Sequence, residues 1–114
     1  MNKIRWKDEC VTLSERQIYL ANMRFEETDE WKTRPVVVVK SRGDTCSVME
    51  ITSRPASYES DVKILDLMCT GLNRESVIQT KKRRRIYKSS LRTYLGVLSH
   101  HDMRRVENVA RLCQ

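Results

Sequence analysis

The chain has 114 residues, 39% of them hydrophobic, which suits one compact domain with a single core and leaves no room for a second. Its 22 Lys and Arg against 15 Asp and Glu give a net charge of +7, which favours a polyanionic partner. No stretch could span a membrane, and the opening residues MNKIRWKDEC lack the apolar run of a signal peptide, so we expect a cytoplasmic protein.

The N-terminal third is predicted to hold one strand and one long loop. Residues 1–15 are charged and weakly patterned, and we expect an arm or short helix there, ahead of a domain over residues 16–114. Residues 17–23 (QIYLANM) are rich in strand formers and predict the first strand. Residues 24–33 are acidic and without periodicity, so an exposed loop is expected, and long exposed loops often carry function.

An apolar hairpin is predicted next. Pro35 opens a run of four valines, and a proline at the first position of a strand costs little. Four β-branched residues in succession predict a strand covered on both faces. Residues 41–44 (SRGD) supply a turn. In the returning strand Met49 and Ile51 should face one way, and the alternate residues Cys46, Val48, Glu50 and Thr52 the other.

Further short strands are predicted over residues 61–67 (DVKILDL), 76–79 and 84–87, with a turn at residues 70–71. These strands precede a single helical segment. Several short strands followed by one closing helix predict a mainly β (α+β) domain, a small β-barrel with a C-terminal α-helix.

The closing helix is predicted over residues 100–112. Ser99 followed three residues later by Asp102 resembles a capping box with Asp in place of Glu. Apolar residues then recur at helical spacing and predict the core face of the helix: Met103, Val106, Val109, Ala110 and Cys113. The neighbouring His100 and His101 are interpreted as surface residues.

The cysteines do not predict a metal site. Cys10, Cys46, Cys69 and Cys113 are far apart and form no CxxC pair, whereas zinc ligands come in pairs at short spacing. Two disulfides are formally possible, but we interpret the four residues as reduced thiols. No metal and no cofactor is expected.

The basic residues concentrate at one place. Residues 81–114 hold ten Lys and Arg against two Asp and Glu, and five of the ten are consecutive. Such a run is often a solvated surface or a tail. Because this one lies between a predicted strand and a predicted helix, we expect it to contact phosphates. The run consists of Lys81, Lys82, Arg83, Arg84 and Arg85.

The order RPVVVV, EITS, TGLNRESVI, RRI and LGVLSHHDMRRVENVARL resembles the MazF/PemK/Kid toxins of type II toxin–antitoxin systems, over residues 16–112. The resemblance implies an SH3-like (CcdB/PemK-type) barrel, a homodimer, and an endoribonuclease that cleaves single-stranded RNA without a metal by attack of the 2′-hydroxyl. It also implies a cognate antitoxin that lays an extended acidic tail along the dimer groove.

The resemblance assigns roles to particular residues. Arg34 matches the arginine that stabilises charge on the phosphate, a task that suits the fixed donor fork of a guanidinium. Thr52 and Ser53 match the hydroxyl pair that orients the scissile phosphate. The basic run would bind the RNA backbone, with Arg84 matching a frequent arginine of the family. Base stacking would fall to aromatic residues, for which the candidates are Phe25, Trp31, Tyr19 and Tyr58.

The sequence departs from the family pattern at two places. Arg16 and Gln17 stand where Gly-Asp is common. Lys81, or its neighbour Thr80, stands where some members have an acid that acts as general base. Three readings follow: Arg34 with Thr52 suffices, Glu26 or Glu27 substitutes, or catalysis is weak. The alternative is a non-catalytic module on the same barrel that binds RNA or a protein such as DNA gyrase.

Overall fold

The computed structural model describes residues 14–25 and 27–113. Residues 1–13, which include most of the expected arm and Cys10, lie outside the described residues, as does Glu26. The elements in chain order are β1 (Gln17–Phe25), β2 (Glu30–Arg42), β3 (Thr45–Thr52), β4 (Asp61–Lys63), β5 (Val77–Tyr87), the 3₁₀ turn η1 (Lys88–Ser90), β6 (Leu91–Val97) and α1 (His100–Leu112).

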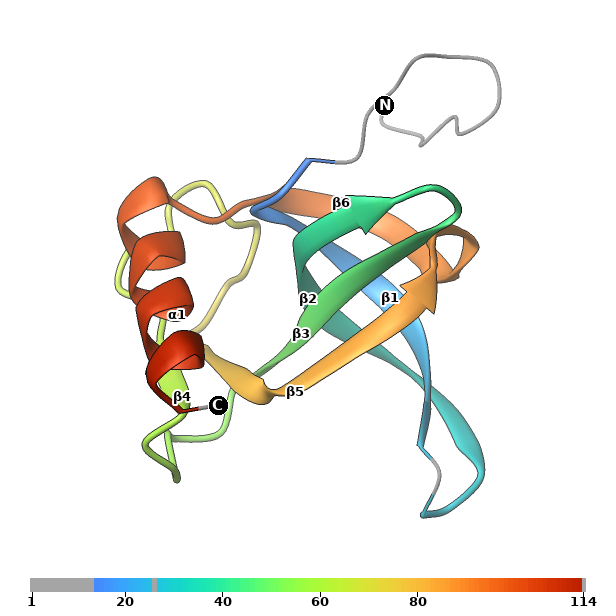
Figure 1. The fold of residues 1–114 in the computed structure, drawn as a ribbon, viewed down its shortest axis with the longest axis horizontal. Helices are drawn as coiled ribbons and strands as arrows, with labels where there is room; N and C mark the ends of the chain where they lie inside the picture. Colours follow the sequence, from blue (N-terminus) through green and yellow to red (C-terminus); the bar gives the residue numbers. More distant parts are fainter. Residues whose placement is uncertain (1–13, 26, 114) are drawn as a thin grey trace.

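The six strands form one antiparallel sheet in the order β4-β5-β3-β2-β1-β6, and α1 lies beside the end of the sheet that carries β4 (Figure 1). The mainly β fold with a C-terminal helix is therefore confirmed. The sheet curls, but within the described residues no pairing joins its two end strands, β4 and β6. The word barrel thus describes the curvature of this sheet and not a closed ring of hydrogen bonds.

The valine run is covered on both faces, as its composition predicts. Val37 belongs to a core on the helix side that contains Met49, Ile51, Met103 and Val106. Val36 and Val38 belong to a second core on the opposite face, together with Tyr19, Ala21, Met23, Cys46, Val48 and Leu91. The predicted alternation along β3 is confirmed, since Met49 and Ile51 lie in the first core and Cys46 and Val48 in the second.

The prediction of a loop over residues 24–33 was wrong. β1 runs on to Phe25 and β2 begins at Glu30, so the two strands form a long hairpin whose tip projects from the molecule (Figure 1). The turn is held by Asp29, which adopts a φ of 57° and accepts hydrogen bonds from Arg24 at 3.0 and 2.6 Å. The acidic composition therefore reflects an exposed hairpin end, where cross-strand pairing replaces any apolar pattern.

The two strands predicted over residues 76–79 and 84–87 are one strand, β5. The pairing with β3 shifts between Gln79 and Arg83, so residues 80–82 form a bulge within the strand. The basic run therefore lies in the sheet, and its expected place between a strand and a helix was wrong. The charges are tolerated there because the side chains of Lys81, Lys82 and Arg83 are exposed to water.

Two further boundaries differ from the prediction. The strand expected over residues 61–67 ends at Lys63, because the backbone N–H groups of Leu65 and Asp66 donate to the Asp102 carboxylate and not to a neighbouring strand. β6 was not predicted at all. Its residues, LRTYLGV, include strand formers, but it is stabilised by pairing with β1, seventy to eighty residues earlier in the chain.

The predicted helix is confirmed with its bounds and its Ser99 cap, but the capping box is not completed, because the Asp102 carboxylate accepts from Leu65, Asp66 and Arg105. Ser99 accepts a hydrogen bond from the backbone N–H of Asp102 at 3.0 Å. Asp102 is fully buried and also accepts from Arg105 at 2.8 Å. Burial by itself would raise the pKa of Asp102, but the hydrogen bonds from Asp66, Arg105 and Leu65 together hold that pKa below its ordinary value. His100 and His101 are exposed, as expected.

Arg16 and Gly71 have a positive backbone φ, a conformation that glycine adopts most easily. Arg16, which stands where the family commonly has glycine, adopts a φ of 79°, a conformation that glycine reaches without steric cost. Its side chain donates to the Leu98 carbonyl at 2.6 Å, which helps to hold this strained residue. Gly71 has a φ of +77°, and a Cβ there would lie 2.1 Å from the Leu95 carbonyl oxygen, so no other residue fits.

Cys46, Cys69 and Cys113 are free thiols. The described part of the chain contains no helix that could cross a membrane.

Candidate functional site

The β2–β3 pairing brings Arg34, within β2, close to Thr52, at the end of β3. Val36 pairs with Glu50, and continuing this register by two residues sets Arg34 opposite Thr52. Residues two apart on a strand share a face, so the Arg34 and Thr52 side chains point to the same side. This arrangement follows from the hairpin expected between these strands.

Arg34, Thr52 and Ser53 all line one open cavity of about 520 Å³, here called the Arg34 cavity. One wall comes from Arg34 and Pro35 within β2 and from the end of β3. The other comes from residues 71–76, the segment that leads into β5, which Gly71 holds against the Leu95 backbone. The full lining is Leu20, Arg34, Pro35, Ile51, Thr52, Ser53, Arg54, Gly71, Leu72, Asn73, Arg74, Ser76 and Leu95.

The Thr52 hydroxyl is already oriented. Its Oγ1 accepts a hydrogen bond from the backbone N–H of Arg54 at 3.1 Å. The hydroxyl proton is therefore left to donate, which is what a phosphate oxygen in the cavity would need. Ser53, exposed beside it, adds a second hydroxyl with no hydrogen bond to any other described residue.

The Arg34 guanidinium is held against an aromatic ring. Its Cζ lies 5.4 Å from the centroid of Phe25, and the Lys32 ammonium lies 5.4 Å from the same centroid. Such contacts attract a cation to the ring and limit its rotamers. Arg34 is nevertheless exposed, so its donors remain free for an anion.

Two cations of the Arg34 cavity were missed from the sequence. Arg54 follows Ser53 directly, and Arg74 lies in the stretch TGLNRESVI, whose resemblance to the family was noticed without assigning its arginine. With Arg34 they give the cavity three guanidinium groups. No Asp, Glu or His of the described residues lines it. Both arginines could have been found from the sequence, because each lies within or beside a segment that carries the family resemblance.

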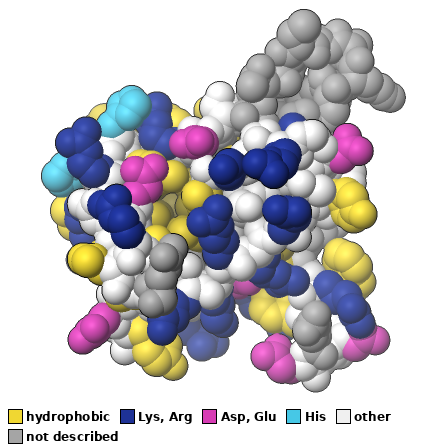
Figure 2. All heavy atoms as spheres, viewed as in Figure 1, with side chains coloured by type: hydrophobic (Ala, Val, Ile, Leu, Met, Phe, Trp, Pro, Cys, Tyr) yellow, Lys and Arg dark blue, Asp and Glu magenta, His cyan; other side chains and the backbone are white. Residues whose placement is uncertain are grey.

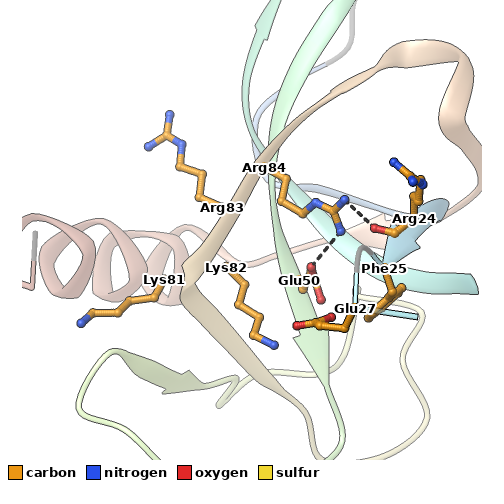
Figure 3. A pocket seen from close by; sticks show the side chains of 8 residues that line it. All are labelled: Arg24, Phe25, Glu27, Glu50, Lys81, Lys82, Arg83 and Arg84. Atoms are coloured by element: carbon orange, nitrogen blue, oxygen red, sulfur yellow. Dashed lines mark hydrogen bonds and ion pairs between the residues drawn. The ribbon is translucent and has the colours of Figure 1, made fainter. Parts of the chain in front are cut away.

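The basic run contributes to a second cavity of about 400 Å³, here called the Glu50 cavity. Figure 3 shows Glu50, Glu27, Lys82 and Arg84 gathered there, whereas the side chains of Lys81 and Arg83 point outward. Arg84 donates to Glu50 at 3.5 Å and to the Arg24 carbonyl at 2.8 Å. The lining is Arg24, Phe25, Glu27, Glu50, Lys81, Lys82, Arg83 and Arg84.

The remaining residues predicted for RNA binding are more scattered. Arg85 pairs with Ser47 in the sheet and lines neither cavity. Trp31 is 65% exposed, but it lies three residues from Arg34 on β2 and so points to the opposite face. Tyr58 is exposed, whereas Tyr19 is buried in the second core and cannot stack on a base.

Lys and Arg side chains gather over the middle of the face shown in Figure 2, along β5.

Of the acids considered as substitutes for the missing general base, Glu27 lines the Glu50 cavity and not the Arg34 cavity. Thr80, one of the two residues at the position of the family acid, is buried and donates its hydroxyl to the Ser60 carbonyl at 2.7 Å. The Thr80 hydroxyl is therefore used in a contact within the fold.

Comparison with known proteins adds the family and the fold. The sequence profile described as "PemK-like, MazF-like toxin of type II toxin-antitoxin system" matches residues 14–113. No protein of curated function matches the chain.

Solved structures with the same fold share little sequence with the chain. A Mycobacterium tuberculosis toxin, MazF-mt6, is 21% identical, with a TM-score of 0.69 over 83% of this chain and 92% of its own. A mycobacterial endoribonuclease in complex with its cognate antitoxin is 12% identical, with a TM-score of 0.74 over 89% and 93%. A MazE-MazF structure from Deinococcus radiodurans is 16% identical, with a TM-score of 0.68 over 92% and 96%.

Proposed function

Because the chain belongs to the PemK-like, MazF-like toxins of type II toxin–antitoxin systems, we propose that it is an endoribonuclease that cleaves single-stranded RNA without a metal. The observation that carries this proposal is the Arg34 cavity, in which one threonine, two serines and three arginines surround a space open to solvent. These are groups that hold a phosphodiester through hydrogen bonds and charge.

In the proposed reaction the substrate supplies the nucleophile. The ribose 2′-oxygen attacks the adjacent phosphorus and loses its proton to water, the bond to the 5′-oxygen breaks, and that oxygen takes up a proton from water. The products are a 2′,3′-cyclic phosphate and a 5′-hydroxyl end. Negative charge builds on the nonbridging oxygens in between, and a preorganised guanidinium stabilises it most in the transition state.

The residues divide this work by position. Arg34, held against the Phe25 ring, faces the phosphate from β2 and stabilises the developing charge. Thr52 donates from the facing end of β3, because its oxygen is already bonded to the Arg54 N–H. Arg54 and Arg74 add positive charge to the same cavity and favour the entry of a polyanion.

The partners follow from the same family. One relative is an endoribonuclease solved with its cognate antitoxin, and another is a MazE-MazF structure. We propose that this chain is likewise neutralised by a cognate antitoxin, that it acts as a homodimer, and that it works in the cytoplasm. An acidic antitoxin segment complements the cations of the Arg34 cavity.

The first prediction is that Arg34→Ala lowers RNA cleavage by about 10²- to 10³-fold, the usual loss when one donor to a developing oxyanion is removed. The measurement is cleavage of end-labelled single-stranded RNA in EDTA. An RNA with a 2′-deoxy sugar at the cleaved position should stay intact, because it lacks the nucleophile.

The matched control is Arg104→Ala, which removes one exposed guanidinium from α1 and lines neither cavity. It should cleave at the wild-type rate. Equal activity of wild type and Arg34→Ala would refute the role of this arginine.

A second candidate function, a non-catalytic RNA-binding module, rests on one observation. No carboxylate or imidazole of the described residues lines the Arg34 cavity, so no conventional general base stands there. Intact RNA after incubation with wild type, with binding that Arg34→Ala weakens, would favour the module over the enzyme.

A further inference from the structure

We propose that the Glu50 cavity is a base-recognition subsite that selects guanine in the nucleotide next to the phosphate held by Arg34. The inference rests on the proposed function in taking single-stranded RNA as the ligand. It goes beyond that function because it assigns a base preference to residues outside the Arg34 cavity.

The Glu50 carboxylate is nearly buried and has few hydrogen-bond partners among the described residues. Glu50 is only 8% exposed, although it sits on β3 beside solvent-facing cations. Among the described residues its carboxylate has one hydrogen-bond partner, Arg84, at the long distance of 3.5 Å. A carboxylate can accept about four hydrogen bonds. Glu50 therefore presents unused acceptor sites, and the space in front of them is the cavity.

The surroundings keep this acceptor in place. Arg84 cannot easily swing away, because its other nitrogen donates to the Arg24 carbonyl at 2.8 Å. It balances the charge of Glu50 without saturating it. Figure 3 shows Lys82 and Glu27 at the mouth of the cavity and Phe25 at its side. The site thus combines a fixed acceptor, an apolar wall and a cationic rim.

The chemistry of the Glu50 cavity suits a nucleobase better than a phosphate. Five Lys and Arg residues also line the cavity, so a phosphate is disfavoured only directly against the Glu50 carboxylate, whereas the edge of a nucleobase offers N–H donors to that carboxylate. Guanine alone presents two neighbouring donors, N1–H and the 2-amino group, with the spacing of the two carboxylate oxygens. Adenine and cytosine offer one amino group and uracil one imino group, so a carboxylate at this place discriminates for guanine.

The Glu50 cavity lies close enough to the Arg34 cavity for one nucleotide to reach both. Glu50 and Thr52 lie two residues apart on the same face of β3, which places their Cα atoms about 7 Å apart. Phe25 lines the Glu50 cavity, and its ring centroid lies 5.4 Å from the Cζ of Arg34, which lines the other cavity, so the two cavities are neighbours. A nucleotide whose phosphate lies at Arg34 can therefore reach Glu50 with its own base or its neighbour's.

The second prediction tests this with mononucleotides, independently of cleavage. Isothermal titration of wild-type protein should find GMP bound about tenfold more tightly than IMP, which differs from it only in lacking the 2-amino group, and AMP more weakly still. Equal affinity for GMP and IMP, or no measurable GMP binding at millimolar concentration, would overturn the proposal without any variant.

Variants then assign the effect to Glu50. Glu50→Gln keeps the shape of the side chain but replaces one acceptor oxygen with a donor, so GMP should lose its advantage over IMP. Circular dichroism checks that this variant is folded. Glu59→Gln removes a carboxylate from an exposed residue outside both cavities and should keep the preference. A preference that survives in folded Glu50→Gln contradicts the assignment.

The outcomes also separate this inference from the proposed function. If RNA is cleaved without regard to guanine and GMP is not preferred, the subsite is refuted and the nuclease stands. If GMP is preferred through Glu50 while RNA stays intact, the subsite stands and the nuclease is refuted.

Discussion

Cys46 and Cys69 carry the same thiol in opposite surroundings. Cys46 points from β3 into the second core and is almost fully buried, and this burial raises its pKa to about 11 from an ordinary value of 9.0. Cys69 is exposed in the segment ahead of Gly71. Because the thiolate is the reactive form, burial makes Cys46 inert as well as inaccessible.

The third prediction follows from this contrast. Under native conditions at pH 8, iodoacetamide should modify Cys69 at least roughly a hundredfold faster than Cys46, since two pKa units alone remove about that much thiolate. Mass spectrometry of peptides taken over time measures both rates in one sample. Denaturant should abolish the difference, and similar native rates would contradict the buried position of Cys46.

The site residues differ in how visible they were in the sequence. Arg34 and Thr52 belong to one hairpin, so their approach depends on a short turn and on strand alternation, and both could be predicted. Glu50 was placed on the correct face of β3, but its importance was not recognised. Its partner Arg84 comes from β5, and only the sheet shows that the two side chains meet.

Among the elements, α1 is tied to the chain before it by one buried side chain. The Asp102 carboxylate accepts backbone hydrogen bonds from Leu65 at 3.1 Å and from Asp66 at 2.9 Å. Arg105, one helical turn on, donates to the same carboxylate and to the Lys63 carbonyl at 2.8 Å. Asp102 therefore joins the helix to the end of β4, and loss of its charge should loosen that junction.

The fourth prediction is that Asp102→Asn lowers the free energy of unfolding at pH 7 by about 1–3 kcal/mol. The folded-state pKa of Asp102 is lowered, so its contribution is present above the ordinary value of 3.8 and is lost as the pH falls through the lower folded-state pKa. The difference between wild type and variant should therefore shrink below pH 3.8.

Urea unfolding at a series of pH values measures this. The control is Glu107→Gln, an exposed carboxylate on the same helix, which should change little at any pH. A wild-type advantage that stayed constant from pH 7 to pH 2 would show that the charge of Asp102 is not the cause.

At the scale of the whole molecule the net charge is +7, and the linings of the two cavities hold eight Lys and Arg against two Glu. The bulge at residues 80–82 turns part of the basic run outward beside the Glu50 cavity, and three more arginines surround the Arg34 cavity. A single strand of RNA that crosses both cavities would displace counterions all along this path, which makes its affinity strongly dependent on salt.

The fifth prediction concerns that dependence. For an uncleavable 2′-deoxy-substituted oligonucleotide, the slope of log affinity against log salt should become shallower by about 1.4 in the double variant Lys81→Ala/Lys82→Ala, since each phosphate contact contributes about 0.7. Fluorescence anisotropy measures the affinities. The double variant Arg104→Ala/Arg111→Ala on α1 removes the same charge away from both cavities and should keep the wild-type slope, whereas a uniform effect of charge would change both.

The sequence by itself determined the features that arise from neighbouring residues. The helix over residues 100–112 was predictable because a cap and a repeating apolar face are both local. The valine strand and its returning partner were predictable because a short turn joins them. Arg34, Thr52 and Ser53 were named from the family resemblance, and the local hairpin predicted only that Arg34 and Thr52 would lie close together.

Only the tertiary structure decided the features that depend on distant partners. β6 exists as a strand because β1 pairs with it, and β5 is continuous because β3 pairs along both halves of it. The open edge of the sheet, the arginines that close the Arg34 cavity, and the meeting of Glu50 with Arg84 follow from that pairing. Such contacts join residues far apart in the chain, and no local pattern records which distant strand a segment will pair with.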